Sequence, residues 1–197
     1  MENKNMIVLK TDKELKILMS PVRQKIIKIM GKEGKPVTPK HIADKLKISP
    51  SSVQHHIKKL EEIGIIEFDH TELINGITAR YIRLSDKTVS IGQDLNDDLS
   101  AERDVLAKSI LSKTYNEFIE LLNKKRKFIS EEYKNGNKMM DQLSGVVHLT
   151  SEDANKLFNL IDDFVKCHAK ASHNTHPFQY ALVAFQADLI DDEKGKD

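Results

Sequence analysis

Two short helical patterns that follow each other with almost no connection constrain this chain most strongly. The first lies in "TPKHIADKLK", where Thr38 suits an N-cap and Pro39 suits the first helical position. The second lies in "SPSSVQHHIKKLEEIG", where Ser49 and Pro50 repeat that start signal and Gly64 suits a left-handed cap at the end. Two helices joined so tightly pack against each other, so the sequence predicts a helix-turn-helix motif.

The pattern changes directly after Gly64. The segment "IIEFDHTELINGITARYIRL" is rich in β-branched and aromatic residues on both sides of Asn75-Gly76. Asn-Gly is the strongest short-range hairpin signal, because a two-residue turn of this kind requires a positive φ. A hairpin in this place corresponds to a wing, although Ile74 and Ile77 make its tip unusually apolar. Residues 1–90 are therefore predicted to form a winged helix-turn-helix domain.

The chain as a whole is predicted to be mainly α-helical. "KELKILMSPVRQKIIKIMGK" shows helical spacing of apolar residues, interrupted by a proline that opens a second helix. After a linker at residues 91–99, residues 100–135 form one long helical pattern with a wide apolar stripe, and Thr150 opens another helix. Residues 178–190, "FQYALVAFQADLI", are strongly β-prone. We expect residues 100–197 to form a mainly helical dimerisation domain with a late β-prone segment.

Charge divides the chain unevenly. Residues 1–90 contain 17 Lys and Arg against 11 Asp and Glu, whereas residues 91–197 contain 14 against 19. The first half is therefore suited to bind polyanions and the second half is not. The single cysteine, Cys167, excludes an internal disulfide framework. Neither an apolar signal sequence nor a run of membrane-spanning length is present, so we expect a cytoplasmic location without membrane contact.

The second helix of the motif has one apolar side and one polar side. Helical spacing places Val53, Ile57 and Leu60 on the buried side. It turns His55 outward and leaves His56 closer to the apolar edge. Ser and Gln can read base edges, Lys can bind phosphate or guanine, and a helix of this width fits the major groove of DNA. The residues predicted to bind double-stranded DNA are Thr38, Ser51, Ser52, Gln54, His55, Lys58, Lys59 and, on the wing, Arg80.

Three stretches carry a resemblance to a known family: "SPVRQKIIKIM", "HIADKLKISPSSVQHHIKKLEEIGII" and "NGITARYIRL". Over residues 15–84 they resemble the winged helix-turn-helix of ArsR-type bacterial transcriptional regulators, and "HLTSEDANKLFNLIDDF" resembles the carboxyl extension of longer members. The resemblance implies a homodimeric repressor or activator whose recognition helix is Pro50–Ile63, and it implies sensing of a metal or a small-molecule effector. The metal-sensing members carry paired cysteines in the preceding helix, whereas "TPKHIADKLK" has none.

Two other functions fit parts of the sequence. "CHAKASHNTH" offers Cys167, His168, His173 and His176 as Zn or Cu ligands, although histidine at a helix end is also a favourable partner for its negative pole. A winged helix that binds protein instead of DNA is the second alternative. The sequence contains no glycine-rich phosphate loop, nucleophile elbow or metal-hydrolase motif, so we expect no enzymatic activity and no cofactor.

Overall fold

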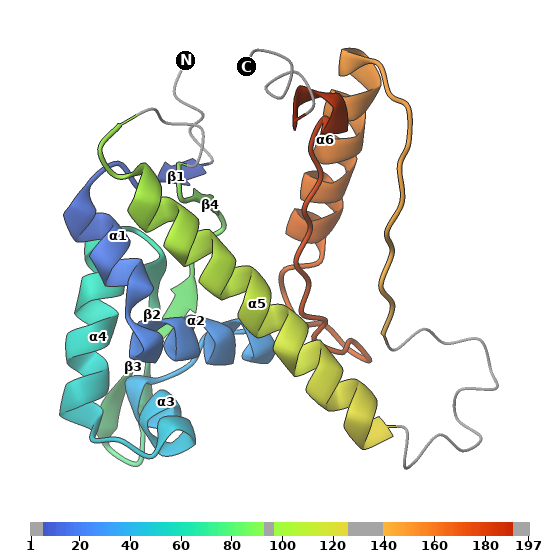
Figure 1. The fold of residues 1–197 in the computed structure, drawn as a ribbon. Coiled ribbons are helices and arrows are strands. Elements are labelled where there is room, and N and C mark those ends of the chain that lie inside the picture. The colour runs from blue at the N-terminus through green and yellow to red at the C-terminus, as the bar shows by residue number, and fades with distance from the viewer. Residues whose placement is uncertain (1–5, 93–96, 126–139, 191–197) are drawn as a thin grey trace.

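Helices α1 to α4 and the hairpin that follows them form the first half of the molecule (Figure 1). This computed structural model describes residues 6–92, 97–125 and 140–190 of the 197. The elements in order are α1 (Asp12–Met19), α2 (Pro21–Glu33), α3 (Pro39–Leu46), α4 (Pro50–Glu62), β2 (Ile66–Ile74) and β3 (Ile77–Leu84). The predicted winged helix-turn-helix is confirmed, with α3 and α4 as the motif and β2–β3 as the wing.

Local sequence sets where α3 and α4 begin. The Thr38 hydroxyl accepts a hydrogen bond from the backbone N–H of His41 at 3.2 Å, and the Ser49 hydroxyl accepts one from Ser52 at 3.3 Å. Each cap satisfies an N–H that the first helical turn leaves without an intrahelical partner. Between the two helices Lys47 adopts the left-handed conformation, with a φ of 56°. Both predicted N-caps are therefore confirmed, and the connection between the helices stays short.

The wing turns at Asn75-Gly76, as the sequence predicts. The φ angles of these residues are 52° and 80°, and the turn places Ile74 opposite Ile77 across the hairpin. A register shift lies nearer the base of the wing, after Phe68. Two consecutive positive φ angles match the right-handed twist of the flanking strands, which is why Asn and Gly are favoured here.

One apolar core lies between the helices and the base of the wing. Ile82 of β3 is buried, and its backbone exchanges two hydrogen bonds of 2.9 Å with Val37, just before α3. Helix α4 contributes Val53, Ile57 and Leu60, which are all buried. Because these three side chains share one side of the helix, the opposite side of α4 faces solvent.

A short parallel pair that the sequence did not indicate joins the start of the chain to the residues just before the linker. β1 (Met6–Val8) pairs with β4 (Thr88–Ser90), and the Leu9 backbone N–H donates to the Ser90 carbonyl at 3.0 Å. Three residues are too few to show an alternating pattern, so periodicity could not reveal these strands. Leu9 is buried in the core, and it anchors the N-terminal segment there.

Helix α5 (Ser100–Lys125) begins against α1 and runs away from the winged helix (Figure 1). Leu106 is buried in the same core as α4. Arg103 is fully buried, and both of its terminal nitrogens donate to the Asp97 carboxylate, one of them at 2.9 Å. The long helix was expected over residues 100–135, of which 126–135 lie outside the described residues.

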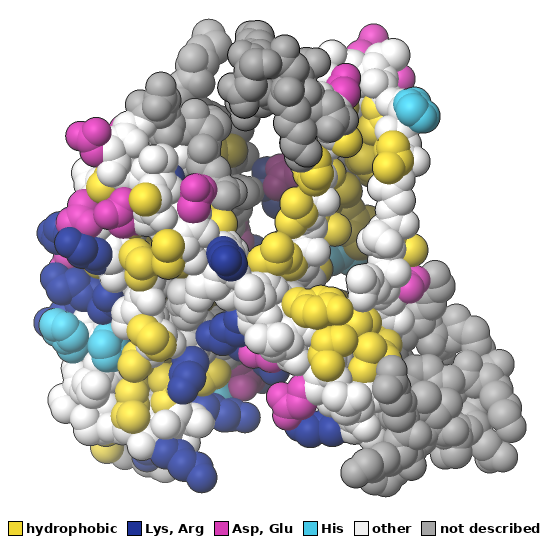
Figure 2. Space-filling view, in the orientation of Figure 1, with side chains coloured by type: hydrophobic (Ala, Val, Ile, Leu, Met, Phe, Trp, Pro, Cys, Tyr) yellow, Lys and Arg dark blue, Asp and Glu magenta, His cyan; other side chains and the backbone are white. Residues whose placement is uncertain are grey.

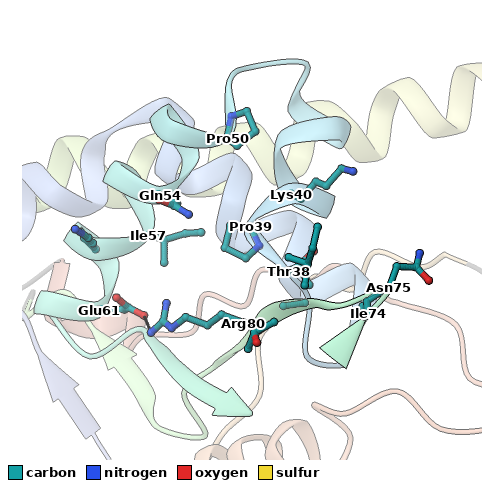
Figure 3. A pocket seen from close by; sticks show the side chains of 14 residues that line it. Thr38, Pro39, Lys40, Pro50, Gln54, Ile57, Glu61, Ile74, Asn75 and Arg80 are labelled. Atoms are coloured by element: carbon teal, nitrogen blue, oxygen red, sulfur yellow. Dashed lines mark hydrogen bonds and ion pairs between the residues drawn. The ribbon is translucent and has the colours of Figure 1, made fainter. Parts of the chain in front are cut away.

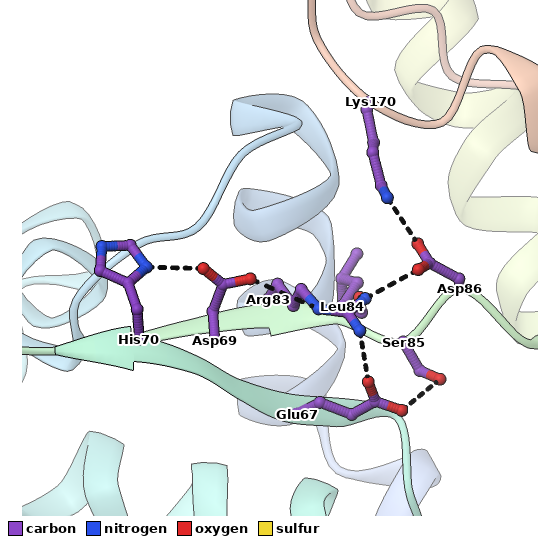
Figure 4. A network of polar contacts seen from close by, with 8 residues as sticks. All are labelled: Glu67, Asp69, His70, Arg83, Leu84, Ser85, Asp86 and Lys170. Carbon is purple, nitrogen blue, oxygen red and sulfur yellow. Dashed lines mark hydrogen bonds and ion pairs between the residues drawn. The ribbon is translucent and has the colours of Figure 1, made fainter.

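A polar network centred on Arg83 ties the wing base to the C-terminal part of the chain (Figure 4). The Arg83 guanidinium lies 2.8 Å from Glu67, 3.0 Å from Asp86 and 3.4 Å from Asp69. The Lys170 ammonium, which belongs to the C-terminal part, lies 3.4 Å from the same Asp86 carboxylate. One arginine thus bridges both wing strands and the turn that leads to β4.

Helix α6 (Ser151–Cys167) stands beside the rest of the molecule (Figure 1). It begins as predicted, because the Thr150 hydroxyl accepts a hydrogen bond from the Asp153 backbone N–H at 3.1 Å. After the helix, the Ala171 N–H donates to the Gly34 carbonyl at the end of α2 at 2.9 Å. None of the residues of α6 is buried, but Ile161 and Val165 are half-buried, so its apolar side is only partly covered within the described chain.

The β-prone segment does not form a strand, which corrects the expectation from its composition. Residues 178–186 have no strand partner, and Ala187–Ile190 forms a short 3-10 helix, η2. A strand requires a neighbour that binds its N–H and C=O groups, and the described part of the chain places none beside this segment. β-propensity describes how a residue fits into a sheet and cannot supply the second strand.

The Arg103–Asp97 pair gives a stability prediction. Asp97→Ala leaves the buried Arg103 guanidinium without its carboxylate, so we expect the melting temperature to fall by roughly 5 °C or more. Arg103→Met removes the buried charge itself, so no carboxylate partner is needed. This substitution should lower the melting temperature less than Asp97→Ala does. Thermal unfolding followed by circular dichroism measures both, with the exposed neighbour Asp98→Ala as control. Equal effects of Asp97→Ala and Asp98→Ala would contradict the assigned role.

Candidate nucleic-acid interface

The solvent-facing side of α4 carries most of the predicted site. Its exposed members are Ser51, Gln54, His55 and Lys58, while Ser52 and Lys59 are half-buried. Figure 2 shows Lys, Arg and His side chains along the edge of the molecule where α4 lies. Hydroxyl, amide, imidazole and ammonium groups follow one another along this side, so it can both donate and accept hydrogen bonds.

The two adjacent histidines occupy different environments. His55 is exposed, whereas His56 is half-buried with its Nδ1 3.5 Å from the Arg23 guanidinium of α2. Burial lowers the pKa of His56, and the charges of Arg23 and His55 lower it further. Arg23 also donates to the Lys16 carbonyl at 2.9 Å and to the Ile17 carbonyl at the end of α1. A neutral His56 therefore belongs to a contact that holds α1, α2 and α4 together.

Sequence reasoning missed Arg23. Its neighbours in "SPVRQKIIK" show only that it lies in the first turn of a helix. Its partners lie on α1 and α4, and no local spacing relates those helices to it. Burial also lowers the pKa of Arg23 itself. A positive charge in this position favours the neutral form of the adjacent His56.

A groove of about 850 Å³ separates α4 from the wing (Figure 3). It brings together four of the predicted residues, Thr38, Gln54, Lys58 and Arg80, from three different elements. The other four predicted residues lie on α4 outside the groove lining. The groove also contains polar residues that the sequence reading left out, namely Lys40, Glu61, Asn75 and Thr78. Its apolar lining consists of Pro39, Pro50, Ile57, Ile74, Ile77 and Ala79.

Two of the predicted cationic residues are held by carboxylates of α4. Arg80 donates to Glu61 at 2.6 Å, and its guanidinium lies 5.4 Å from the centre of the Phe68 ring. Lys59 donates to Glu62 at 2.7 Å, and this hydrogen bond lowers the pKa of the Glu62 carboxyl. Lys58, by contrast, has no ion-pair partner among the described residues. Of these three cations, Lys58 in the third turn of α4 is therefore the one left available to a ligand within the described chain.

The four residues weighed as metal ligands do not come together. Cys167 is exposed, and His168 stacks on Phe164 at 4.3 Å with its Nδ1 2.7 Å from the Phe164 carbonyl. Over residues 6–92, 97–125 and 140–190, no group of three or more His, Cys, Asp or Glu is arranged to hold a metal ion. His168 instead binds a carbonyl at the end of α6, where histidine is favourable.

Comparison with protein families supports the helical motif. Residues 18–67, which span α2 to α4, match a family model described as a helix-turn-helix domain. A search of curated proteins gave no match. In the described part of the chain, no helix combines the length and apolar character that crossing a bilayer requires.

Solved structures overlap with the chain at low TM-scores. A possible transcriptional regulator from Methanosarcina mazei has 17% identity and a TM-score of 0.33, over 55% of this chain and 85% of its own. A double mutant of ZitR from Lactococcus lactis, in apo form, has 18% identity and a TM-score of 0.29, over 77% and 83%. The heme sensor PefR from Streptococcus agalactiae, in complex with heme, has 13% identity and a TM-score of 0.33, over 83% and 84%. Overlaps of this size assign no function.

The Arg23–His56 contact predicts a pH dependence of stability. Because the folded protein lowers the pKa of His56 below its usual 6.5, the unfolded chain binds this proton first as pH falls. Stability from this contact is therefore present above pH 6.5 and is lost as pH falls below it. His56→Gln should flatten the decrease of melting temperature between neutral and mildly acidic pH, whereas His55→Gln, which removes only the smallest of the three causes of the lowered pKa, should flatten it much less. Parallel slopes for the wild type and His56→Gln would contradict the contact.

Proposed function

We propose that this protein is a DNA-binding transcriptional regulator that places α4 in the major groove. The observation that carries the proposal is the outer side of α4, where Ser51, Gln54, His55 and Lys58 are exposed. An α-helix fits the major groove, and the first turns of a recognition helix make most base contacts. The match to a helix-turn-helix domain over residues 18–67 supports the same assignment.

The groove beside α4 suits the strand of DNA that passes between the helix and the wing. Gln54 and Lys58 line one wall, and Arg80 and Asn75 line the other (Figure 3). Thr38 and Lys40 lie at the start of α3, where backbone N–H groups and the helix dipole favour phosphate. Lys58 is the cation best placed to bind the backbone, since it lacks an ion-pair partner among the described residues.

Arg80 binds phosphate only after it exchanges partners. Its present partner is Glu61, on the same helix that enters the groove. The Arg80 side chain is 45% exposed and that of Glu61 is 26% exposed, so the ion pair is partly screened by solvent and stabilises the free protein only modestly. A phosphate is negatively charged, as the carboxylate is, and it can accept two hydrogen bonds from the guanidinium. When DNA binds, Arg80 of the wing therefore leaves Glu61 of α4 and contacts a phosphate instead.

The first test compares base and phosphate contacts. A duplex selected from a random pool serves as specific ligand, and an unrelated duplex serves as non-specific ligand. Gln54→Ala should weaken specific binding by about 1–3 kcal/mol and leave non-specific binding unchanged. Lys58→Ala should weaken both and reduce the salt slope by about one. Fluorescence anisotropy against salt concentration measures both quantities, and Lys124→Ala on α5 is the matched control.

Failure to select any duplex at low salt would contradict DNA binding. It would favour a protein partner instead, and one observation supports that second candidate. The wing tip carries Leu73 and Ile77, which are 71% and 73% exposed. Apolar side chains with this exposure are unusual beside phosphates and are typical of a protein-binding surface.

The regulator is proposed to act as a homodimer through α5. Along this helix, Ile110, Leu111, Tyr115 and Leu121 are exposed by 40–50%. An uncovered apolar stripe of this length is typical of a helix that packs against a partner helix. Two-fold pairing would present two copies of α4 to successive major grooves, and this doubles the base contacts that one short helix can make.

The second test measures mass in solution. Light scattering should give twice the chain mass of 22.5 kDa. Leu111→Lys introduces a charge into the proposed contact and should shift the mass toward one chain, whereas Lys108→Ala on the same helix should not. A monomeric wild type at high concentration would contradict the dimer and leave DNA binding by one copy as a separate question.

A further inference from the structure

The tip of the wing, residues 73–79, contains no charged residue and exposes large apolar side chains. Leu73 and Ile77 are 71% and 73% exposed, and Ile74 is 42% exposed. A Cβ atom placed on Gly76 of the turn would meet no atom within 4 Å, so the turn touches no other part of the described chain. The tip therefore extends from the domain with its apolar side chains available to a ligand.

These side chains occupy both faces of the tip. Across the hairpin Leu73 lies opposite Thr78, and Ile74 lies opposite Ile77. Because successive side chains of a strand point to opposite faces, Leu73 is on one face and the two isoleucines are on the other. A flat partner surface covers only one face of a hairpin. A slot with two walls covers both, so the tip is suited to insertion into a slot.

The base of the wing holds the tip in a fixed place beside α4. Ile66 and Ile82 are buried in the same core as the inner side of α4. Ile82 also exchanges two backbone hydrogen bonds of 2.9 Å with Val37, next to α3. A hairpin anchored in this way inserts as a preformed unit, and a ligand of α4 meets the tip at a constant offset.

Charge selects the kind of ligand that meets the tip. The groove between α4 and the wing extends to Ile74, and its lining includes Lys40 and Lys58, which have no ion-pair partner among the described residues. Glu61, at the other end of the groove, is bound to Arg80 (Figure 3). The groove is therefore positive beside an apolar tip. Its ligand must be a polyanion that also offers apolar surface within a slot.

We propose that the wing tip inserts Leu73 and Ile77 into the minor groove of DNA and unstacks one base step there, which bends the duplex. The minor groove is a slot about 6 Å wide, between walls that carry phosphates only at their outer rims. Leu and Ile side chains inserted from this groove part the base pairs and bend the duplex toward the major groove. Apolar side chains unsuited to the phosphates thus reach the apolar faces of the bases.

This role of the tip rests on the proposed DNA binding by α4 and adds a second source of specificity. Pyrimidine–purine steps such as TA and CA unstack most easily, whereas A-tracts are stiff. Because the tip is anchored to the same core as α4, the deformed step should lie at a fixed distance from the bases that α4 contacts. Selected duplexes should therefore carry a pyrimidine–purine step at that one position.

The experiment uses the full chain and the duplex selected from a random pool. Energy transfer between dyes at the two duplex ends should report a bend on binding, and 2-aminopurine should brighten at the unstacked step. Leu73→Thr combined with Ile77→Thr should remove the bend and weaken binding roughly tenfold. The salt slope should stay unchanged, since no charge is altered. Val183→Thr, at 68% exposure, is the matched control and should change none of these.

Each contrary result has a distinct meaning. A selected duplex that binds without a bend or a bright 2-aminopurine would overturn the insertion and leave DNA binding by α4 standing. A bend that the double variant retains would assign the deformation to another element and overturn the role of the tip. Failure to bind any duplex would overturn the proposed function as well, and the tip would then belong to a protein surface. The bend and the fluorescence are measured on the unmodified chain, so they decide the matter even if the double variant unfolds.

Discussion

The burial of Val53, Ile57 and Leu60 is the interaction on which the rest of the structure depends. A helix whose apolar side is held in a close-packed core cannot rotate about its axis. The polar side of α4 therefore has one direction to face. The wing leaves the end of the same helix through Gly64, whose φ is 74°, so the hairpin lies beside the exposed side. Helix α5 enters the same core through Leu106 and is anchored to the same frame.

The charges around α4 are distributed along its length. Its first half carries hydroxyl and amide groups, while its second half carries Glu61 and Glu62, which bind Arg80 and Lys59. Exposed ion pairs of this kind contribute ~0–1 kcal/mol. These ion pairs favour one position of each side chain in the free protein. They are weak enough that a phosphate could replace the carboxylate. Under the proposed function, the wing cation Arg80 would exchange Glu61 for phosphate when DNA binds.

The two halves of the molecule differ in how much of their own apolar surface they bury. Apart from its wing, the winged helix buries most of its large apolar side chains in or against one core, whereas α6 has no buried residue. The halves are joined by polar contacts, such as Lys170 with Asp86 and the backbone bond from Ala171 to Gly34. Polar contacts of this kind set a relative position without covering apolar surface. Within the described residues, the C-terminal half therefore leaves much of its apolar surface exposed to solvent.

The sequence by itself determined the elements whose causes are local. Ser49 caps α4 and Asn75-Gly76 turns the wing, because a cap or a two-residue turn involves only neighbours in the chain. The tertiary structure alone decided the partners of long side chains. Arg80 binds Glu61, which lies 19 positions away in the sequence, and Arg23 contacts His56 of α4, which lies 33 positions away. No periodicity of the sequence encodes such separations. The same limit explains why residues 178–185 form no strand: propensity is a property of the residues, whereas a sheet also requires a neighbouring strand.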